Sequence, residues 1–118
     1  MHELSLAEKI NSTIKGLCER SAWTRVRRIV LKVGRMRQVD PELLTFALNV
    51  TAKGTVSEGA EVSVLELPII FMCHSCGKET NSEGTVFICA NCGSANVELR
   101  SGMELTIESM EVESRQVL

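Results

Sequence analysis

Four cysteines in two Cys-x-x-Cys motifs are the residues of this sequence with the clearest chemistry. The motifs Cys73-His74-Ser75-Cys76 and Cys89-Ala90-Asn91-Cys92 are separated by twelve residues. Two residues between thiolates let both sulfurs of one turn face one ion, and two such turns complete the tetrahedral sulfur cage that Zn²⁺ favours. Gly77 and Gly93 follow the motifs, where a tight turn often needs a positive φ. Because a four-thiolate cage has no open coordination position, we expect a structural zinc ion.

The first three residues, Met1-His2-Glu3, form a second set of candidate metal ligands. A free terminal amine, the next peptide nitrogen and the imidazole of His2 can close adjacent chelate rings around Ni²⁺ or Cu²⁺, which favour tetragonal nitrogen and oxygen donors. The next amide or a nearby carboxylate can complete the plane. On spacing alone this is weak evidence, because a histidine at a chain terminus is more often a solvated residue of a frayed end.

The composition restricts the class of protein. The chain has 118 residues, 44% of them hydrophobic and 24% charged, which suits one modest core and one smaller metal-stabilised insertion. We expect no signal peptide and no membrane span. Five cysteines, four of them in metal spacing, suit a reducing cytoplasm, and Cys18 is expected to be a thiol on a helix face. The net charge of −2 weighs against a general nucleic-acid binder.

Two helices and a strand are predicted in the first half of the chain. Apolar residues recur at helical spacing over residues 4–20, and β-branched residues over residues 23–33 indicate a strand. Asp40-Pro41-Glu42 is a typical helix start, with a capping carboxylate followed by proline at the first helical position. The helix should end near Gly54, and its buried side is expected to comprise Leu43, Leu44, Phe46, Ala47 and Val50.

The cysteine motifs lie between two further predicted strands. Residues 61–71 form the first, with Pro68 implying an edge position or a bulge, and the second begins at Met103, with a change of phase before Met110. The sequence therefore predicts an α+β fold in which two helices pack on a three-stranded sheet. Residues 1–71 plus 102–118 would form this main domain, and residues 72–101 an inserted four-cysteine zinc-binding module of the rubredoxin or zinc-ribbon type.

Charged residues are unevenly distributed along the predicted strands. Residues 19–37 contain seven basic side chains against one acid, and residues 101–118 contain four acids against one arginine. The first and third strands are expected to lie side by side, so that their solvent faces form cross-strand ion pairs. A docking surface for an acidic partner or for nucleic acid stays open as an alternative, although a single Trp, three Phe and no Tyr offer few platforms for stacking bases.

Three landmarks together resemble the HypA/HybF family of hydrogenase-maturation nickel chaperones. They are the hexapeptide Met1-His2-Glu3-Leu4-Ser5-Leu6, the segment Asp40-Pro41-Glu42-Leu43-Leu44-Thr45-Phe46-Ala47, and the paired cysteine motifs. The landmarks occur in family order over essentially the full length. The cysteine motifs alone are shared with many zinc ribbons, whereas the amino-terminal hexapeptide combined with them is far more specific.

The resemblance implies a nickel metallochaperone rather than an enzyme. It places nickel on the amine of Met1 and on His2, with Glu3 contributing its backbone nitrogen and, as an option, its carboxylate. It also places Asp40 where the family carries an acid that can contact nickel, with a plain helix cap as the alternative role of Asp40. Zinc would be bound by Cys73, Cys76, Cys89 and Cys92. His74 can tune the zinc site with pH, although a solvated turn histidine explains it as well.

The implied partners are the nickel-handling GTPase HypB and the large subunit of [NiFe]-hydrogenase, and in some organisms relatives also serve urease. A homodimer, the client enzyme and the nickel geometry are left open. Two other classes compete with this hypothesis. A zinc-ribbon module that binds nucleic acid or transcription machinery would show strong, salt-dependent affinity for DNA or RNA. A thiol oxidoreductase would need an exposed cysteine of low pKa and activity without zinc.

Overall fold

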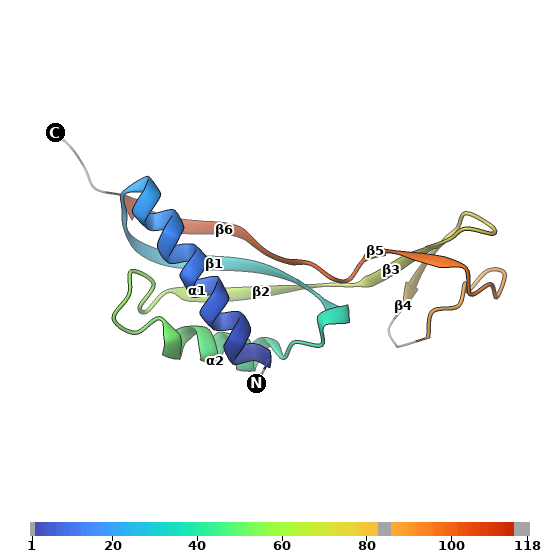
Figure 1. The fold of residues 1–118 in the computed structure, drawn as a ribbon, viewed down its shortest axis with the longest axis horizontal. Coiled ribbons are helices and arrows are strands. Elements are labelled where there is room, and N and C mark those ends of the chain that lie inside the picture. The colour runs from blue at the N-terminus through green and yellow to red at the C-terminus, as the bar shows by residue number, and fades with distance from the viewer. Residues whose placement is uncertain (1, 83–85, 115–118) are drawn as a thin grey trace. The chain divides into compact units, whose positions relative to one another are not determined.

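The computed structural model describes residues 2–82 and 86–114 and has an α+β fold (Figure 1). Two α-helices and six strands follow one another in the order α1 (His2–Ser21), β1 (Trp23–Gly34), α2 (Pro41–Thr51), β2 (Glu61–Leu67), β3 (Ile69–Cys73), β4 (Glu79–Ser82), β5 (Val97–Ser101) and β6 (Leu105–Ser114), with a 3₁₀ helix at Arg35–Arg37. The strands form two three-stranded sheets, ordered β2-β1-β6 and β4-β3-β5. The predicted fold class is therefore confirmed.

The chain divides into two compact units. The first comprises residues 1–31, 39–64 and 107–118, and the second comprises residues 32–38 and 65–106. Both helices lie in the first unit, and all four cysteines of the two motifs lie in the second. None of the helices in the described part of the chain is long and apolar enough to cross a membrane.

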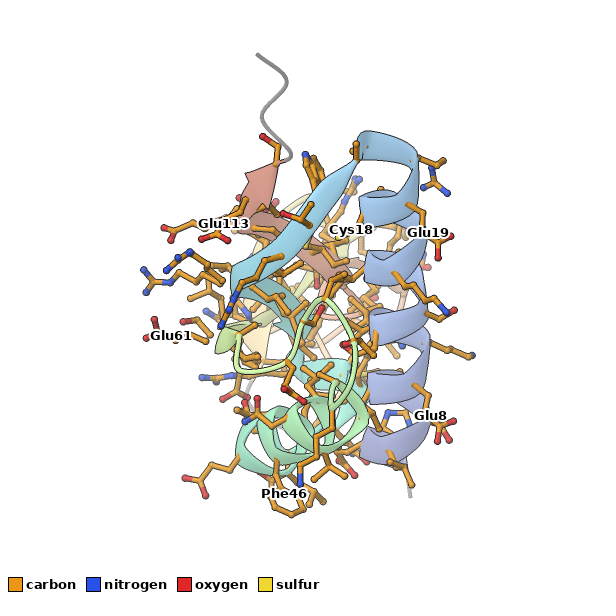
Figure 2. The ribbon with its side chains drawn as sticks, turned by 90° about the vertical axis from the view of Figure 1, so that its left-hand side faces the viewer. Glu8, Cys18, Glu19, Phe46, Glu61 and Glu113 are labelled. Carbon is orange, nitrogen blue, oxygen red and sulfur yellow. The ribbon has the colours of Figure 1, made fainter. Side chains whose placement is uncertain are left out.

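The core of the first unit is formed by its two helices and the strand between them. The helices contact each other. In the part of β1 that belongs to this unit, Val26, Ile29 and Leu31 are buried. Helix α1 contributes Leu6, Ala7, Ile10, Ile14 and Cys18, as its apolar spacing predicts. Figure 2 shows Cys18 on the side of α1 that faces β1, while Glu8 and Glu19 point away from it.

Helix α2 differs from the prediction in which side chains it buries. Asp40 caps its first turn as predicted, accepting hydrogen bonds from the amides of Glu42 and Leu43. Leu44, Ala47 and Leu48 are buried. The expected burial of Leu43, Phe46 and Val50 is wrong, because all three are exposed. These three residues lie on one arc of the helix, and the core covers the arc that carries Leu44 and Leu48.

Pro68 divides the predicted strand 61–71 into β2 and β3, which belong to different sheets. A proline cannot donate to a strand ladder, so pairing on one side ends where proline occurs. Strand β3 then pairs antiparallel with β4 and β5, with an irregularity between Ile70 and Phe71. This second sheet was not predicted, because β4 is only four residues long and contains no apolar residue, and the alternation of β5 extends over only five residues.

Glycine is required where β1 meets the turn before β6. A Cβ on Gly34 would lie 2.1 Å from both the carbonyl carbon and the oxygen of Gly102. The amide of Gly34 donates to the carbonyl of Glu104 at 2.8 Å, and the amide of Met36 donates to the carbonyl of Gly102 at 2.8 Å. The backbones therefore approach closer than any side chain permits. This turn also delays the start of β6 to Leu105, two residues after the predicted start.

Strands β1 and β6 are neighbours, as the charge distribution predicts. Arg27 of β1 forms an ion pair with Glu113 of β6. Both side chains are exposed, so the pair contributes little to stability, about 0–1 kcal/mol. The phase change in β6 is also observed, because the consecutive residues Glu108 and Ser109 are both exposed. The basic strand is thus at least partly matched by acidic neighbours.

Candidate metal centres

The two cysteine motifs come together in one cluster. The sulfurs of Cys73, Cys76, Cys89 and Cys92 all lie within 4.8 Å of one another. Two separations between the motifs are 3.6 Å, from Cys73 to Cys92 and from Cys76 to Cys89. Four sulfurs around a tetrahedral Zn²⁺ at about 2.3 Å lie about 3.8 Å apart. The cluster therefore has the size of a zinc cage.

The two motifs form the same local structure. In each, the amide two residues after the first cysteine donates to its sulfur, from Ser75 to Cys73 at 3.3 Å and from Asn91 to Cys89 at 3.4 Å. In each, the glycine amide four residues after that cysteine donates to its carbonyl, at 2.8 Å and 2.9 Å. Those glycines have φ values of 76° and 77°, which favour a residue without a Cβ.

Strands and turns hold the cluster at fixed positions. Cys73 ends β3 and its amide donates to the carbonyl of Lys78 at 2.9 Å, while the amide of Cys89 donates to the carbonyl of Ser94 at 2.9 Å. The hydroxyls of Ser75 and Ser94 meet at 3.1 Å between the motifs. Cys73 and Cys89 are buried and Cys76 and Cys92 are exposed. One sulfur of each motif therefore faces the interior and one faces solvent.

The protonation of the thiols also favours a cation. The amide of Cys76, and after it that of Ser75, lowers the pKa of Cys73 to about 6. The amide of Cys92 likewise lowers the pKa of Cys89. The amide of Ser94 lowers the pKa of Cys92, but the neighbouring sulfurs of Cys73, Cys76 and Cys89, together with burial, outweigh it and raise that pKa to about 12. Like charges this close cannot all ionise without a compensating cation, so the donor set fits Zn²⁺.

The predicted amino-terminal site lies at the start of α1. Met1 lies outside the described residues, and His2 is the exposed first residue of the helix. The Glu3 carboxylate accepts a hydrogen bond from the Asp40 amide at 3.1 Å. This contact, foremost, lowers the pKa of Glu3. Glu3 and Asp40, 37 residues apart in the sequence, are thus neighbours in the fold.

Both carboxylates at this site already serve a structural purpose. Glu3 joins the start of α1 to the start of α2, and Asp40 caps α2. The link between Glu3 and the Asp40 amide was not anticipated, although an acid in the first turn of one helix and a capped start of another are each visible in the sequence. The other histidine of the chain, His74, lies in the second unit, where its amide donates to the carbonyl of Asn96 at 2.9 Å.

A family model matches residues 1–112 of the chain. The family is HypA, described as a metallochaperone for nickel incorporation into hydrogenase and urease. One similar protein is the hydrogenase maturation factor HypA of Trichormus variabilis, which is 36% identical over 113 residues, and the match covers 96% of each chain. Another is the hydrogenase maturation factor HypA of Rhodobacter capsulatus, which is 34% identical over 112 residues, and the match covers 95% of this chain and 99% of the relative.

A solved structure has the same fold. The solution structure of the Ni metallochaperone HypA from Helicobacter pylori superposes with a TM-score of 0.71, and the match covers 98% of this chain and 100% of that one. The sequences are 20% identical, so this likeness concerns the fold alone. It extends over both compact units, including the segment with the cysteine cluster.

Proposed function

Because this chain belongs to the HypA family of nickel-incorporation metallochaperones for hydrogenase maturation, we propose that it binds Ni²⁺ at its amino terminus and delivers it to an apo-[NiFe]-hydrogenase. The family consists of metallochaperones and not of enzymes. The amine of Met1, the imidazole of His2 and the backbone nitrogen of Glu3 would supply the nickel donors, with the carboxylate of Glu3 or Asp40 as a further one. The observation that carries this proposal is the placement of His2, Glu3 and Asp40 at one end of the first unit.

The chemistry of this segment suits transfer of an ion. Nitrogen and oxygen donors in a tetragonal arrangement are those that Ni²⁺ prefers. His2 is exposed and its ring is therefore accessible to an incoming protein. The carboxylates of Glu3 and Asp40 each accept amide hydrogen bonds on one oxygen, so the other oxygen of either group would be the nickel donor. A site with so few side-chain donors favours release.

The zinc site has the opposite character. We infer that Cys73, Cys76, Cys89 and Cys92 bind one Zn²⁺ permanently, because the four sulfurs leave no open position for exchange. Zinc supplies here the positive charge that lets all four thiolates remain ionised. Its purpose is to hold the second unit folded. We propose residues 72–101 as the inserted zinc domain and residues 1–71 plus 102–118 as the nickel domain.

The partners follow from the proposed task. We infer that the chain receives or shares nickel with the maturation GTPase HypB and contacts the hydrogenase large subunit, with urease as a second client. We place the protein in the cytoplasm, because five cysteines with four of them in metal spacing suit a reducing compartment.

Nickel titration by calorimetry tests the proposal on the untagged protein with its native amino terminus. We expect one site, and we expect His2→Ala to weaken binding by more than about tenfold, since even outer-shell partners cost 10–100-fold in metal affinity. His74→Ala is the matched control, because the chain has only two histidines. Full one-site affinity in the His2 variant, or after acetylation of the amine, would remove the proposed site.

A further inference from the structure

Strand β5 forms one edge of the second sheet (Figure 1), because β3 is its only neighbour among the described strands. An edge strand carries backbone N–H and C=O groups that have no partner in the sheet and that can pair with another chain. Two apolar side chains accompany this edge: Leu99 within β5 is 38% exposed, and Met103 just after it is 49% exposed. Free backbone groups beside apolar surface are the combination that binds an extended peptide.

Two hydrogen bonds near the end of β3 show which way its backbone groups point. The amide of Cys73 donates to the carbonyl of Lys78, on the β4 side, and the amide of His74 donates to the carbonyl of Asn96, on the β5 side. Both bonds are 2.9 Å long. The backbone groups of successive strand residues point to opposite sides, so every second residue of β3, counted back from His74, faces β5.

This alternation determines which residue of β5 faces the free edge. Met72 faces β5 and lies opposite Glu98, so the backbone groups of Glu98 point toward β3. The N–H and C=O groups of the next residue, Leu99, therefore point away from β3. No hydrogen bond from the described parts of the chain outside the sheet reaches these two groups of Leu99. A peptide residue opposite Leu99 can exchange two hydrogen bonds with it.

The side chain of Leu99 lies between two hollows of the second unit. It shares a face of the sheet with Phe71, which lies opposite it in the register. A hollow of about 390 Å³ on this face is lined by Met36, Phe71, Phe87, Ala95, Val97 and Leu99. A hollow of about 260 Å³ is lined by Leu99, Arg100, Ser101, Met103 and Glu104. An apolar side chain placed opposite Leu99 would therefore find apolar surface on both sides.

One acid and one base flank Leu99. The side chains of Glu98 and Arg100 are 51% and 48% exposed, and 3.4 Å separates their nearest charged atoms. Both lie on the other face of the sheet, where Arg100 also contacts the sulfur of Met72 at 3.2 Å. In an antiparallel segment, the residue opposite Leu99 shares its face, and the residues on either side share the face of the charges. An acid before that residue then meets Arg100, and a base after it meets Glu98.

We propose that β5 binds an extended segment of another protein, antiparallel, with an apolar residue opposite Leu99 that is preceded by an acid and followed by a base. A second copy of β5 also reads acid, apolar, base, but its strand ends at Ser101. Centred on Leu99, that copy would bring only Ala95 to Met103. A foreign segment can place a large side chain there, so it is the occupant that the surface favours.

Fluorescence anisotropy of a labelled synthetic peptide, acetyl-LTVEFKVT-amide, tests this proposal on the zinc-loaded full chain. We expect saturable binding, and we expect methylation of the phenylalanine nitrogen to weaken it by about twofold to tenfold, because that nitrogen donates to the carbonyl of Leu99. Methylation of the lysine nitrogen, which points away from β5, is the matched control and should have little effect. No binding of the unmodified peptide, or equal losses from the two methylations, overturns the proposal.

Exchange of charges tests the antiparallel arrangement. The peptide acetyl-LTVKFEVT-amide should bind the wild type more weakly, because it places like charges together, and the Glu98→Lys/Arg100→Glu double variant should prefer it. This reversal of preference is not expected from a merely structural effect of the substitutions. If both proteins prefer the same peptide, the antiparallel pairing is wrong.

Leu99→Pro tests the free edge directly. Proline removes an N–H that does not face β3, so the sheet and its zinc content should persist while peptide binding falls by at least about twofold. Nickel titration of this variant should match the wild type, because the proposed nickel donors lie outside the second unit, and this result separates the two proposals. A wild-type dimer in sedimentation equilibrium that Leu99→Pro abolishes would identify a second copy as the occupant and overturn the proposal.

Discussion

Asp40 caps helix α2 and is also a proposed nickel contact, and two substitutions separate these roles. Asp40→Ala removes the cap and should lower the free energy of unfolding by about 1 kcal/mol, whereas Asp40→Asn keeps it, because asparagine is an equally good capping residue. If the carboxylate contacts nickel, both variants should bind nickel more weakly. Urea denaturation and nickel titration of the pair measure the two effects. Unchanged nickel affinity in Asp40→Asn leaves Asp40 with the cap alone.

The hydrogen bond from the Asp40 amide to Glu3 should depend on pH. The Asp40 amide, foremost, lowers the pKa of Glu3 below its usual value of 4.5. A carboxylate whose pKa falls on folding stabilises the folded state above the unfolded pKa and loses that contribution as pH falls through the folded pKa. We therefore expect the Asp40 amide resonance to titrate with a midpoint below 4.5. Amide NMR in the absence of nickel measures this titration, and Glu3→Gln should abolish it.

At the level of the strands, Gly34 is required for space and not for its dihedral angles. Its φ of −73° and ψ of 142° suit any residue, but a Cβ would lie 2.1 Å from the Gly102 backbone. Gly34→Ala should therefore lower the free energy of unfolding by about 1–3 kcal/mol. Gly16→Ala in α1 should act in the opposite direction by about 0.5–1 kcal/mol, because only the end of the Arg20 side chain lies near, at 3.4 Å.

Chemical denaturation of the two glycine variants compares them directly with the wild type. If both substitutions changed the free energy of unfolding equally and with the same sign, the close approach of Gly34 to Gly102 would not be what makes glycine necessary at position 34. A loss of stability at Gly34 and a gain at Gly16 are expected, because two backbones cannot move apart as readily as the flexible end of one arginine side chain.

At the scale of the whole molecule, the two compact units should respond differently to loss of zinc. Both helices lie in the first unit, while the cysteine cluster lies in the second. A chelator should therefore disorder the second unit, while most of the helical circular dichroism at about 222 nm remains. Amide NMR spectra before and after chelation identify the affected residues, and added zinc should restore them. Simultaneous loss of helical signal and of all dispersed amides would show that the units do not unfold separately.

Much of this protein can be predicted from residues that are close together in the sequence. The Cys-x-x-Cys turns, the Asp40 cap and the apolar face of α1 depend on spacings of a few residues, because a turn or a helix brings such residues together whatever the remainder of the chain does. The amino-terminal hexapeptide and the cysteine motifs were likewise sufficient to indicate the family. These features act through local geometry, and each was found where it was expected.

Other features were decided only by the tertiary structure. Apolar residues cover about 200° of α2, which is wider than one packing contact, and only the position of α1 and β1 determines that Leu44 is buried while Phe46 is exposed. The contact between Glu3 and Asp40 and the pairing of β3 with β5 join segments far apart in the sequence. Long-range pairing depends on which surfaces the whole chain brings together, and no local pattern contains that information.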